Sequence, residues 1–430
     1  MIKQLIFLCL LTFAIQGSAQ HHFIETARQT LQWLNNRNFD SLEAIVEVKS
    51  KKALSAERME FIWDDFTEKY DSLITINETK IEANDSLYVT ETLIAFKKKE
   101  FNYKVTFNKN KQIVGLFFLN TKLQYEPPSY VNSLAFVEYK IAVPVKNIQS
   151  NGVLSLPRNV TKPPLVIIVG GSGPTDADGT FGPNKMYKDL AWGLASSGIA
   201  AYRYDKRTAN PLNIKRTATF GIKDEYIEDI EAIIKLFKAD NRINSKQIWL
   251  LGHSQGGYVI PSISKHIKGY ILMAASNRNI PEMIVEQCDY LLSSTKEPNA
   301  ERAYTQLRSK AIYTNKITSV NKVYNDSLID GVTAYYIISE RKLNPVPFIR
   351  KNKKPLLVIQ GARDYQVTTK DLDRWREVIP SSTPNEIKVY ENLNHLFMSG
   401  KGLSKPDEYL KLNHIEQQVI IDITTFIKTH

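Results

Sequence analysis

The chain has 430 residues, of which 43% are hydrophobic and 23% charged, and its formal net charge is +11. This composition excludes a disordered chain, a collagen and a coiled coil, and the length suggests two or three domains. The basic residues are scattered along the chain and form no long tract, so we expect no nucleic-acid binding. Cys9 and Cys288 are too few for a zinc site built from thiolates.

The first twenty residues have the pattern of an export signal. Lys3 supplies a basic start, residues 5–15 are mostly apolar, and Gly17 and Ala19 are small residues placed as a cleavage site requires. We therefore expect residues 1–19 to be a signal peptide and the mature protein to be periplasmic or extracellular; an uncleaved anchor is the alternative. No later apolar run reaches the ~20 residues that span a bilayer, so we expect no stable membrane insertion after cleavage.

Residues 21–120 predict a small α+β domain. Apolar residues recur at helical spacing in Phe23–Leu34, and a second helix is expected to begin after Ser55. The hydrophobic period then falls to two, and Asn108–Lys111 predicts a hairpin turn. Helices followed by an antiparallel meander indicate an α+β domain. The proline-bearing segment 121–133 is expected to be a linker.

Residues 134–430 alternate between short apolar runs and amphipathic helical patterns. The expected strands are Leu165–Val169, Ile199–Tyr202, Ile248–Leu251, Tyr270–Ala274 and Leu356–Ile359. The expected helices between them include Lys185–Ala195, Asp224–Phe237 and Tyr258–His266. Fully apolar strands with crossover helices predict an α/β domain whose mostly parallel sheet is covered on both faces. The long charged segment 278–354 is interpreted as a helical cap inserted over the carboxyl edge of that sheet.

One motif suggests a nucleophile. The stretch Gly252–Gly256 reads Gly-His-Ser-Gln-Gly, which matches G-x-S-x-G, and it lies between an expected strand and an expected helix. Glycines two positions before and after the serine relieve crowding in such a turn. Ser254 is therefore the candidate nucleophile; the alternative is a serine in an ordinary glycine-rich turn.

A serine nucleophile needs a base, and in this fold an acid and a histidine follow it along the chain. Asp364 comes directly after the strand that ends at Ile359, and His395 lies one helix and one strand further on. The hypothesis is that His395 takes the serine proton and that Asp364 fixes its tautomer. The other candidates are Asp371, Asp373, His253, His266, His414 and His430.

The glycine-rich loop 170–174 follows the first expected parallel strand. The backbone N–H groups of Ser172 and Gln255 are the candidate donors of an oxyanion hole. A nucleotide-binding loop is not expected, because neither G-x-G-x-x-G nor a following Lys-Ser or Lys-Thr is present. The charged segment Arg203–Arg207 follows the next strand, and it is interpreted as an ion-pair cluster or as a contact for an anionic substrate.

Four segments together resemble a known superfamily: Gly171–Pro174, Tyr202–Thr208, Gly252–Gly256 and Gly361–Thr368. In this order they look like the α/β-hydrolase superfamily. More narrowly, they resemble bacterial carboxylesterases of the EstD-like group, close to the serine aminopeptidase and dienelactone hydrolase branches. The resemblance covers about residues 137–430 and implies a Ser254, Asp364 and His395 triad. The N-terminal part resembles the small domain of NTF2-like type, of unknown function, that precedes some of these esterases.

The leading hypothesis is an exported serine hydrolase that cleaves small-molecule carboxylic esters through an acyl-enzyme, with no metal and no organic cofactor. The alternative within the same fold is a serine peptidase of the aminopeptidase type. It would need an acidic or amide-bearing anchor for the substrate amine, and none stands out in the cap sequence. A non-catalytic binding protein is the third hypothesis, and the presence of all three triad residues argues against it. The sequence carries no signal for an oligomeric state.

Overall fold

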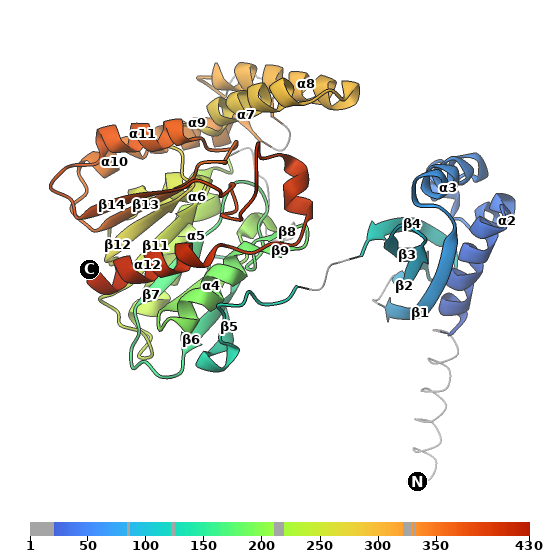
Figure 1. Ribbon diagram of the computed structural model, residues 1–430, viewed down its shortest axis with the longest axis horizontal. Helices are drawn as coiled ribbons and strands as arrows, with labels where there is room; N and C mark the ends of the chain where they lie inside the picture. The colour runs from blue at the N-terminus through green and yellow to red at the C-terminus, as the bar shows by residue number, and fades with distance from the viewer. Residues whose placement is uncertain (1–20, 84–86, 122–124, 210–218, 321–327, 330–331) are drawn as a thin grey trace, which may run out of the picture. The chain divides into compact units, whose positions relative to one another are not determined.

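The computed structural model divides into two compact units, Met1–Leu123 and Gln124–His430. It describes residues 21–83, 87–121, 125–209, 219–320, 328–329 and 332–430 (Figure 1). The expected signal peptide therefore lies outside the described residues. Within the described part of the chain, no helix combines the length and the apolar character needed to cross a membrane.

The N-terminal unit combines helices with a four-stranded antiparallel sheet of order β1-β2-β3-β4 (Figure 1). Its helices are residues 21–35, Phe39–Ala44 (α2) and Ala56–Tyr70 (α3), and its strands are Leu73–Ala83 (β1), Leu87–Phe96 (β2), Glu100–Asn108 (β3) and Ile113–Asn120 (β4). The Ser55 side chain accepts a hydrogen bond from the Arg58 amide, as an N-cap does. This confirms the predicted start of α3.

Alternation along β3 builds the core of this unit. Every second residue from Phe101 to Phe107 is buried and packs with the helices, as the period of two predicted. The turn after β3 is closed by the Asn108 side chain, which accepts from the amides of Asn110 and Gln112. The predicted α+β architecture and its hairpin are therefore confirmed.

The second unit is built on an eight-stranded sheet of order β14-β13-β12-β11-β7-β10-β6-β5. The strands are Phe136–Val145 (β5), Ile148–Pro157 (β6), Leu165–Val169 (β7), Ala200–Tyr204 (β10), Ile248–His253 (β11), Gly269–Met273 (β12), Leu356–Gly361 (β13) and Asn385–Tyr390 (β14). The six strands from β14 to β10 are parallel, as predicted, whereas β5 and β6 pair antiparallel. The sequence did not predict β5 and β6, because half-exposed strands carry no continuous apolar run.

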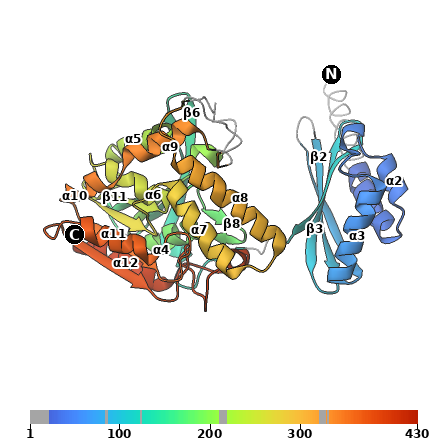
Figure 2. The same cartoon turned by 90° about the horizontal axis from the view of Figure 1, so that it is seen from above.

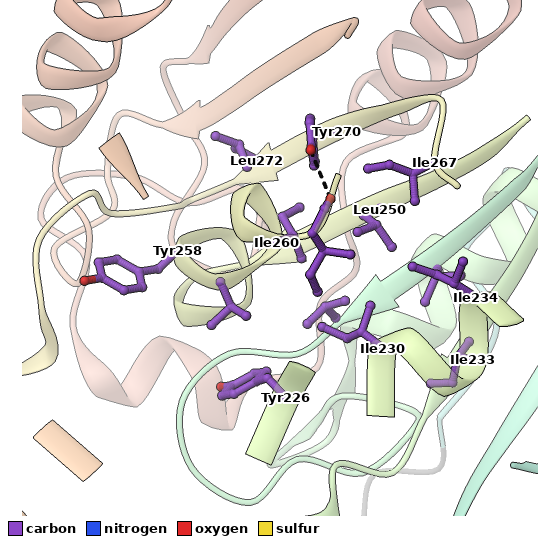
Figure 3. Packing of buried hydrophobic residues seen from close by; sticks show 14 of the residues in the cluster. Tyr226, Ile230, Ile233, Ile234, Leu250, Tyr258, Ile260, Ile267, Tyr270 and Leu272 are labelled. Carbon is purple, nitrogen blue, oxygen red and sulfur yellow. Dashed lines mark hydrogen bonds between the residues drawn. The ribbon is translucent and has the colours of Figure 1, made fainter. Parts of the chain in front are cut away.

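Helices cover both faces of this sheet (Figure 1). The α-helices in the described part of this unit are Met186–Ser196 (α4), Glu228–Lys238 (α5), Gln255–Val259 (α6), Ile280–Ser294 (α7), Pro298–Asn315 (α8), Ala334–Leu343 (α9), Val346–Arg350 (α10), Thr369–Val378 (α11) and Gln417–Thr429 (α12). One core packs α5, α6, α10 and α11 on one face, and a second packs α4 and α12 on the other. Figure 3 shows Ile230, Ile233 and Ile234 of α5 beside Leu250 in the first of these cores.

One predicted helix is wrong. The expected helix Tyr258–His266 is instead the short α6, which ends at Val259 and is followed by a 3₁₀ turn over Ile260–Ser262. Pro261 lies in this turn and has no amide proton to continue a helix. Because α6 is buried throughout, it also lacks the polar stripe that marks an amphipathic helix.

The segment 278–354 contains α7, α8, α9 and α10. In both views α7 and α8 lie side by side as an antiparallel pair (Figure 1 and Figure 2). Residues of α7 and α9 line a cavity together with Ser254, which follows the carboxyl end of β11. The predicted cap over this edge of the sheet is therefore present.

Candidate active site

Ser254 stands at a sharp turn between a strand and a helix. β11 ends at His253, α6 begins at Gln255, and Ser254 between them has a φ of 52° and a ψ of −121°. Residues with a side chain rarely adopt a positive φ, and such strain persists where the surrounding structure enforces it, often at functional sites. The turn places the serine at the carboxyl edge of the sheet, next to the N-terminus of α6.

Close packing explains the glycines of this turn. A Cβ atom on Gly252 would lie 2.5 Å from the Gly257 amide nitrogen, and one on Gly256 would lie closer still to the Val169 carbonyl. Neither contact occurs between real Cβ atoms and backbone, so both positions require glycine. The crowding expected from the G-x-S-x-G pattern is present.

Asp364 and His395 meet in loops that follow the neighbouring strands β13 and β14. The His395 Nδ1 lies 2.7 Å from Asp364 Oδ2, and both side chains are buried. The other carboxylate oxygen, Oδ1, accepts from the amides of Gln366 and Val367 at 2.8 and 3.0 Å. Since a carboxylate only accepts, Nδ1 carries the proton, which leaves Nε2 free to act as a base.

Among the described residues, none of the alternative acids or bases forms a hydrogen bond with the side chain of Asp364 or His395. Asp371 is bound to the Arg278 guanidinium, and Asp373 is exposed and paired with Arg376. His414 contacts Asp189 of α4. Of the candidate pairs considered from the sequence, Asp364 with His395 is the pair that the structure places in contact.

Ser254 and His395 line the same cavity of about 210 Å³, hereafter the His395 cavity. The glycine loop from Gly171 to Thr175 forms another part of its wall. In the part of the chain that the structure describes, no hydrogen bond joins Ser254 Oγ to the His395 ring. Such bonds are often long or misaligned before substrate binds and form in the substrate complex.

Of the two candidate oxyanion donors, Ser172 lines this cavity, and Gln255 directly follows Ser254 in the chain. Neither the Ser172 amide nor the Gln255 amide donates to another group among the described residues. By contrast, the Gly171 amide donates to the Tyr187 hydroxyl at 3.0 Å and is not available to a ligand. Of these two loop amides, that of Ser172 and not that of Gly171 is therefore free to donate to an oxyanion.

His253 has a structural place beside the pair. Its Nε2 donates to the His395 carbonyl at 3.0 Å, and its Nδ1 accepts from the Tyr187 hydroxyl at 3.1 Å. Burial, with a smaller contribution from His395, lowers the pKa of His253 to about 3. A neutral His253 thus anchors the backbone of the loop that carries His395, a connection that the sequence gave no reason to expect.

A second cavity, hereafter the cap cavity, has a volume of about 160 Å³ and is lined by Ser254, Gln255, Ile280, Met283, Arg278 and Glu340 among others. Glu340 of α9 is 1% exposed, and its carboxyl accepts from Gln255 Nε2 at 3.1 Å and from the Ile280 amide. No lysine or arginine among the described residues forms an ion pair with it, and burial raises its pKa to about 8. Sequence reasoning missed Glu340, because no motif surrounds it.

Among the described residues, no group of three or more His, Cys, Asp or Glu side chains is arranged to hold a metal ion. Cys288 is a free, buried cysteine on α7.

Comparisons with known proteins agree with this fold. The family model described as "Serine aminopeptidase, S33" matches residues 179–401, and the one described as "Protein of unknown function (DUF3887)" matches residues 27–116. Esterase EstD of Thermotoga maritima is 32% identical over 413 residues, which are 94% of this chain and 95% of that protein. Each family model matches within one unit, and the match to Esterase EstD covers both units.

Two solved esterases are more distant. Est1E from Butyrivibrio proteoclasticus is 16% identical with a TM-score of 0.45, over 68% of this chain and 99% of that one. The Pyrococcus furiosus esterase Pf2001 is 17% identical with a TM-score of 0.45, over 71% of this chain and 98% of that one.

The protein is thus a carboxylesterase-type hydrolase of the α/β-hydrolase fold. The S33 match spans just over half of the chain, and the match to Esterase EstD spans nearly all of it. The chain belongs to the serine aminopeptidase (S33) family of α/β-hydrolases and is a relative of Esterase EstD, which confirms the resemblance inferred from its motifs.

Proposed function

We propose that this protein is an exported serine esterase that hydrolyses small carboxylic esters through an acyl-enzyme on Ser254. The observation that carries the proposal is the buried 2.7 Å contact between Asp364 and His395 beside a strained serine that lines the same cavity. A strained nucleophile, an oriented base and two free amides are the parts that acyl transfer needs.

The chemistry follows from these positions. His395 Nε2 removes the Ser254 proton while Oγ attacks the ester carbonyl, and the resulting oxyanion accepts from the Ser172 and Gln255 amides. The C–O bond to the alcohol then breaks, and the imidazolium returns the proton to the leaving oxygen. Water, deprotonated by the same imidazole, attacks the acyl-enzyme and releases the acid. No other reactant is needed.

The two cavities suggest how an ester is oriented. The leaving oxygen must come within reach of His395, so the alcohol portion belongs in the His395 cavity. The acyl portion then extends into the cap cavity, where Ile280, Met283 and Ile284 supply an apolar wall. This assignment favours esters of small apolar acids.

The proposal is tested by turnover of p-nitrophenyl esters in Ser254→Ala and in a matched control, Ser262→Ala. Ser262 lies in the turn after α6, and its hydroxyl donates to a local carbonyl, away from both cavities. We expect Ser254→Ala to lose about 10⁴- to 10⁶-fold in kcat with its fold intact, and the control to retain activity. A tenth of wild-type turnover in Ser254→Ala would rule the assignment out.

A second candidate function rests on Glu340. A peptidase of the aminopeptidase type needs an anchor for the substrate's amine. Glu340 offers a buried carboxyl in the cavity that Ser254 lines, and it has no ion-pair partner among the described residues. Binding an ammonium group would favour its ionised form and offset the cost of burying that charge.

Glu340→Gln separates the two candidates, because glutamine keeps the size of the side chain and removes its charge. For a peptidase we expect a large rise in KM for aminoacyl anilides and no change for neutral esters. For an esterase, aminoacyl anilides are poor substrates of the wild type, and the substitution does not alter the preference. The two substrates are compared at one pH near 8, where Glu340 is partly ionised.

Export is the part of the proposal that depends on the sequence alone. Residues 1–19 have the composition of a cleaved signal, with small residues at Gly17 and Ala19. We expect the mature chain to begin after Ala19 and to be recovered from the periplasm or the medium. N-terminal sequencing of the purified native protein checks this, and a retained Met1 in the cytoplasmic fraction would contradict it.

A further inference from the structure

The segment Arg203–Arg207 has no role in the mechanism above. Its two arginines form internal ion pairs, Arg203 with Glu138 and Asp178, and Arg207 with Asp229. Lys206 also has an ion-pair partner, Glu225. Lys206 is 2% exposed and differs from both, because it reaches the loop that carries Ser172. The interpretation that this segment contacts an anionic substrate therefore does not fit these three side chains.

All three protons of the Lys206 ammonium have acceptors inside the protein. Its Nζ lies 2.8 Å from the Gly171 carbonyl oxygen, 2.7 Å from the Tyr226 hydroxyl and 2.9 Å from Glu225 Oε1. An ammonium group has three donors, so none remains for a substrate. Whatever Lys206 contributes to the reaction, it contributes through these partners.

The Gly171 carbonyl is one end of a peptide group whose other end is the Ser172 amide. In a planar trans peptide the C=O and N–H bonds point in opposite directions, so fixing the oxygen also fixes the direction of the proton. The Tyr226 hydroxyl lies 2.7 Å from the same carbonyl oxygen as Lys206. Two buried donors therefore hold this peptide from the side opposite the cavity.

A charged donor does more than hold the carbonyl. Hydrogen bonds from an ammonium group are about twice as strong as neutral ones, and bonds in series polarise each other. Electron density drawn toward the Gly171 oxygen makes the Ser172 N–H a stronger donor to an oxyanion. Glu225 offsets the cost of burying the ammonium: burial lowers the pKa of Lys206, and the carboxylate opposes that shift.

The same cluster reaches the second oxyanion donor. Tyr226 lies within a π-helical turn, Lys223–Ile227, and its hydroxyl is 2.8 Å from Gln255 Oε1. The hydroxyl has one proton, so it donates either to the Gly171 carbonyl or to Gln255 Oε1 at any moment, whereas the Lys206 ammonium can donate to Gly171 in both cases. Gln255 Nε2 donates in turn to the Tyr336 hydroxyl and to Glu340. One buried network thus holds both the Gln255 side chain and the Gly171 carbonyl, which belongs to the same peptide group as the Ser172 amide.

We propose that Lys206 is the positioning residue of the oxyanion hole: by binding the Gly171 carbonyl with Tyr226, it aims and polarises the Ser172 amide toward the developing oxyanion. The proposal rests on the serine-esterase function proposed above. Because an oxyanion forms only during reaction, Lys206 raises kcat and has little influence on substrate binding.

The test compares Lys206→Met with Arg207→Met, which removes a neighbouring buried cation that does not contact the glycine loop. Two ligands are titrated: a trifluoromethyl ketone, which adds to Ser254 and forms an oxyanion, and the corresponding carbinol, which cannot. For Lys206→Met we expect kcat on a neutral ester to fall about 10- to 100-fold, with KM within about threefold. The Kd of the ketone should rise by a similar factor, and that of the carbinol should not change.

Arg207→Met is expected to lower the melting temperature while each folded molecule keeps wild-type kcat and ketone affinity. The proposal is wrong if Lys206→Met leaves the Kd of the ketone unchanged, or if it raises the Kd of the ketone and of the carbinol equally. It is also wrong if Arg207→Met raises the Kd of the ketone as much as Lys206→Met does. If Lys206→Met does not fold, the same two ligands are titrated against Tyr226→Phe, and this variant tests the proposal instead. It removes one of the two donors to Gly171, so a selective loss of ketone affinity of about 3- to 10-fold supports the proposal and no loss overturns it.

Failure of the proposed function gives a different result. If Ser254 is not the nucleophile, wild-type protein and Ser254→Ala bind the ketone equally well. If Ser254 is the nucleophile but Lys206 is only structural, the ketone adduct requires Ser254 and is insensitive to Lys206→Met.

Discussion

The two units of this protein bury different kinds of side chain. Among the described residues of the N-terminal unit, the buried polar side chains are threonines: Thr30, Thr79, Thr90 and Thr92. In the hydrolase unit the buried polar set includes many ionisable groups: Asp189, Arg203, Lys206, Arg207, Glu225, Asp229, His253, Glu340, Asp364, Asp371, His395 and Asp422. Among the described residues, the hydrolase unit thus buries many Asp, Glu, Lys, Arg and His side chains, and the N-terminal unit buries none.

The difference indicates where the chemistry is located. Burying a charge costs several kcal/mol unless partners compensate, so a unit that needs only to fold gains by excluding charge. The N-terminal unit follows this rule with an aromatic core around Trp63, Phe96 and Phe101. The hydrolase unit gathers several of its buried charges around Ser254 and the loop that precedes Ser172. Each prediction below tests whether buried charge and function coincide.

The largest effect is expected for Asp364→Asn. Asparagine would present an N–H group to His395 Nδ1, which reverses the tautomer and removes the free base at Nε2. We expect kcat to fall by about 10⁴-fold with little change in melting temperature. Asp373→Asn, in the exposed acid that the sequence offered as a rival, should keep full activity. If Asp373→Asn lost activity and Asp364→Asn did not, Asp373 would be the acid of the triad.

An effect on stability without an effect on catalysis is expected for Trp63→Ala. Trp63 is 3% exposed in the N-terminal core, and removing such a side chain costs about 3–5 kcal/mol. Calorimetry should show destabilisation confined to the N-terminal unit, with unchanged turnover of small esters. Phe61→Ala, on the exposed side of the same helix, should change neither. A parallel loss of turnover in Trp63→Ala would mean that the N-terminal unit completes the active site.

A smaller, pH-dependent effect is expected for Glu340→Gln. Burial raises the pKa of Glu340 to about 8 in the folded protein, whereas in the unfolded chain the carboxyl has its ordinary pKa of 4.5. The folded state therefore binds more protons between these values, and this contribution to stability is lost as the pH rises through them. Between pH 5 and 8 the wild type should lose about 2–4 kcal/mol of unfolding free energy relative to Glu340→Gln. Glu301→Gln, at the surface of α8, should follow the wild type.

The sequence predicted those features that depend on local pattern. Continuous apolar runs located the parallel strands, and the G-x-S-x-G context located the turn at Ser254, because both leave a signature within a few residues. The strands β5 and β6 were missed, since their exposed positions break the apolar run. The helix after Ser254 was misjudged because burial on all sides removes its amphipathic period.

The polar network around the nucleophile had no such signature. Glu340 meets Gln255 across 85 positions of sequence, and Lys206 meets Gly171 across 35. Contacts of this kind depend on the packing of the cap and of the sheet edge, which no spacing rule describes. Lys206 was recognised as part of a charged segment, but which of its three cations faced the glycine loop could be decided only in three dimensions.

The central claim is that Ser254 is a nucleophile activated by His395. It is tested most directly by reacting the protein with a fluorophosphonate, mapping the adduct by mass spectrometry and following its rate in wild type and His395→Ala. The account predicts one adduct per chain, on Ser254, formed at least about 10³-fold more slowly in His395→Ala. An adduct on another residue, or equal rates in the two proteins, would contradict it.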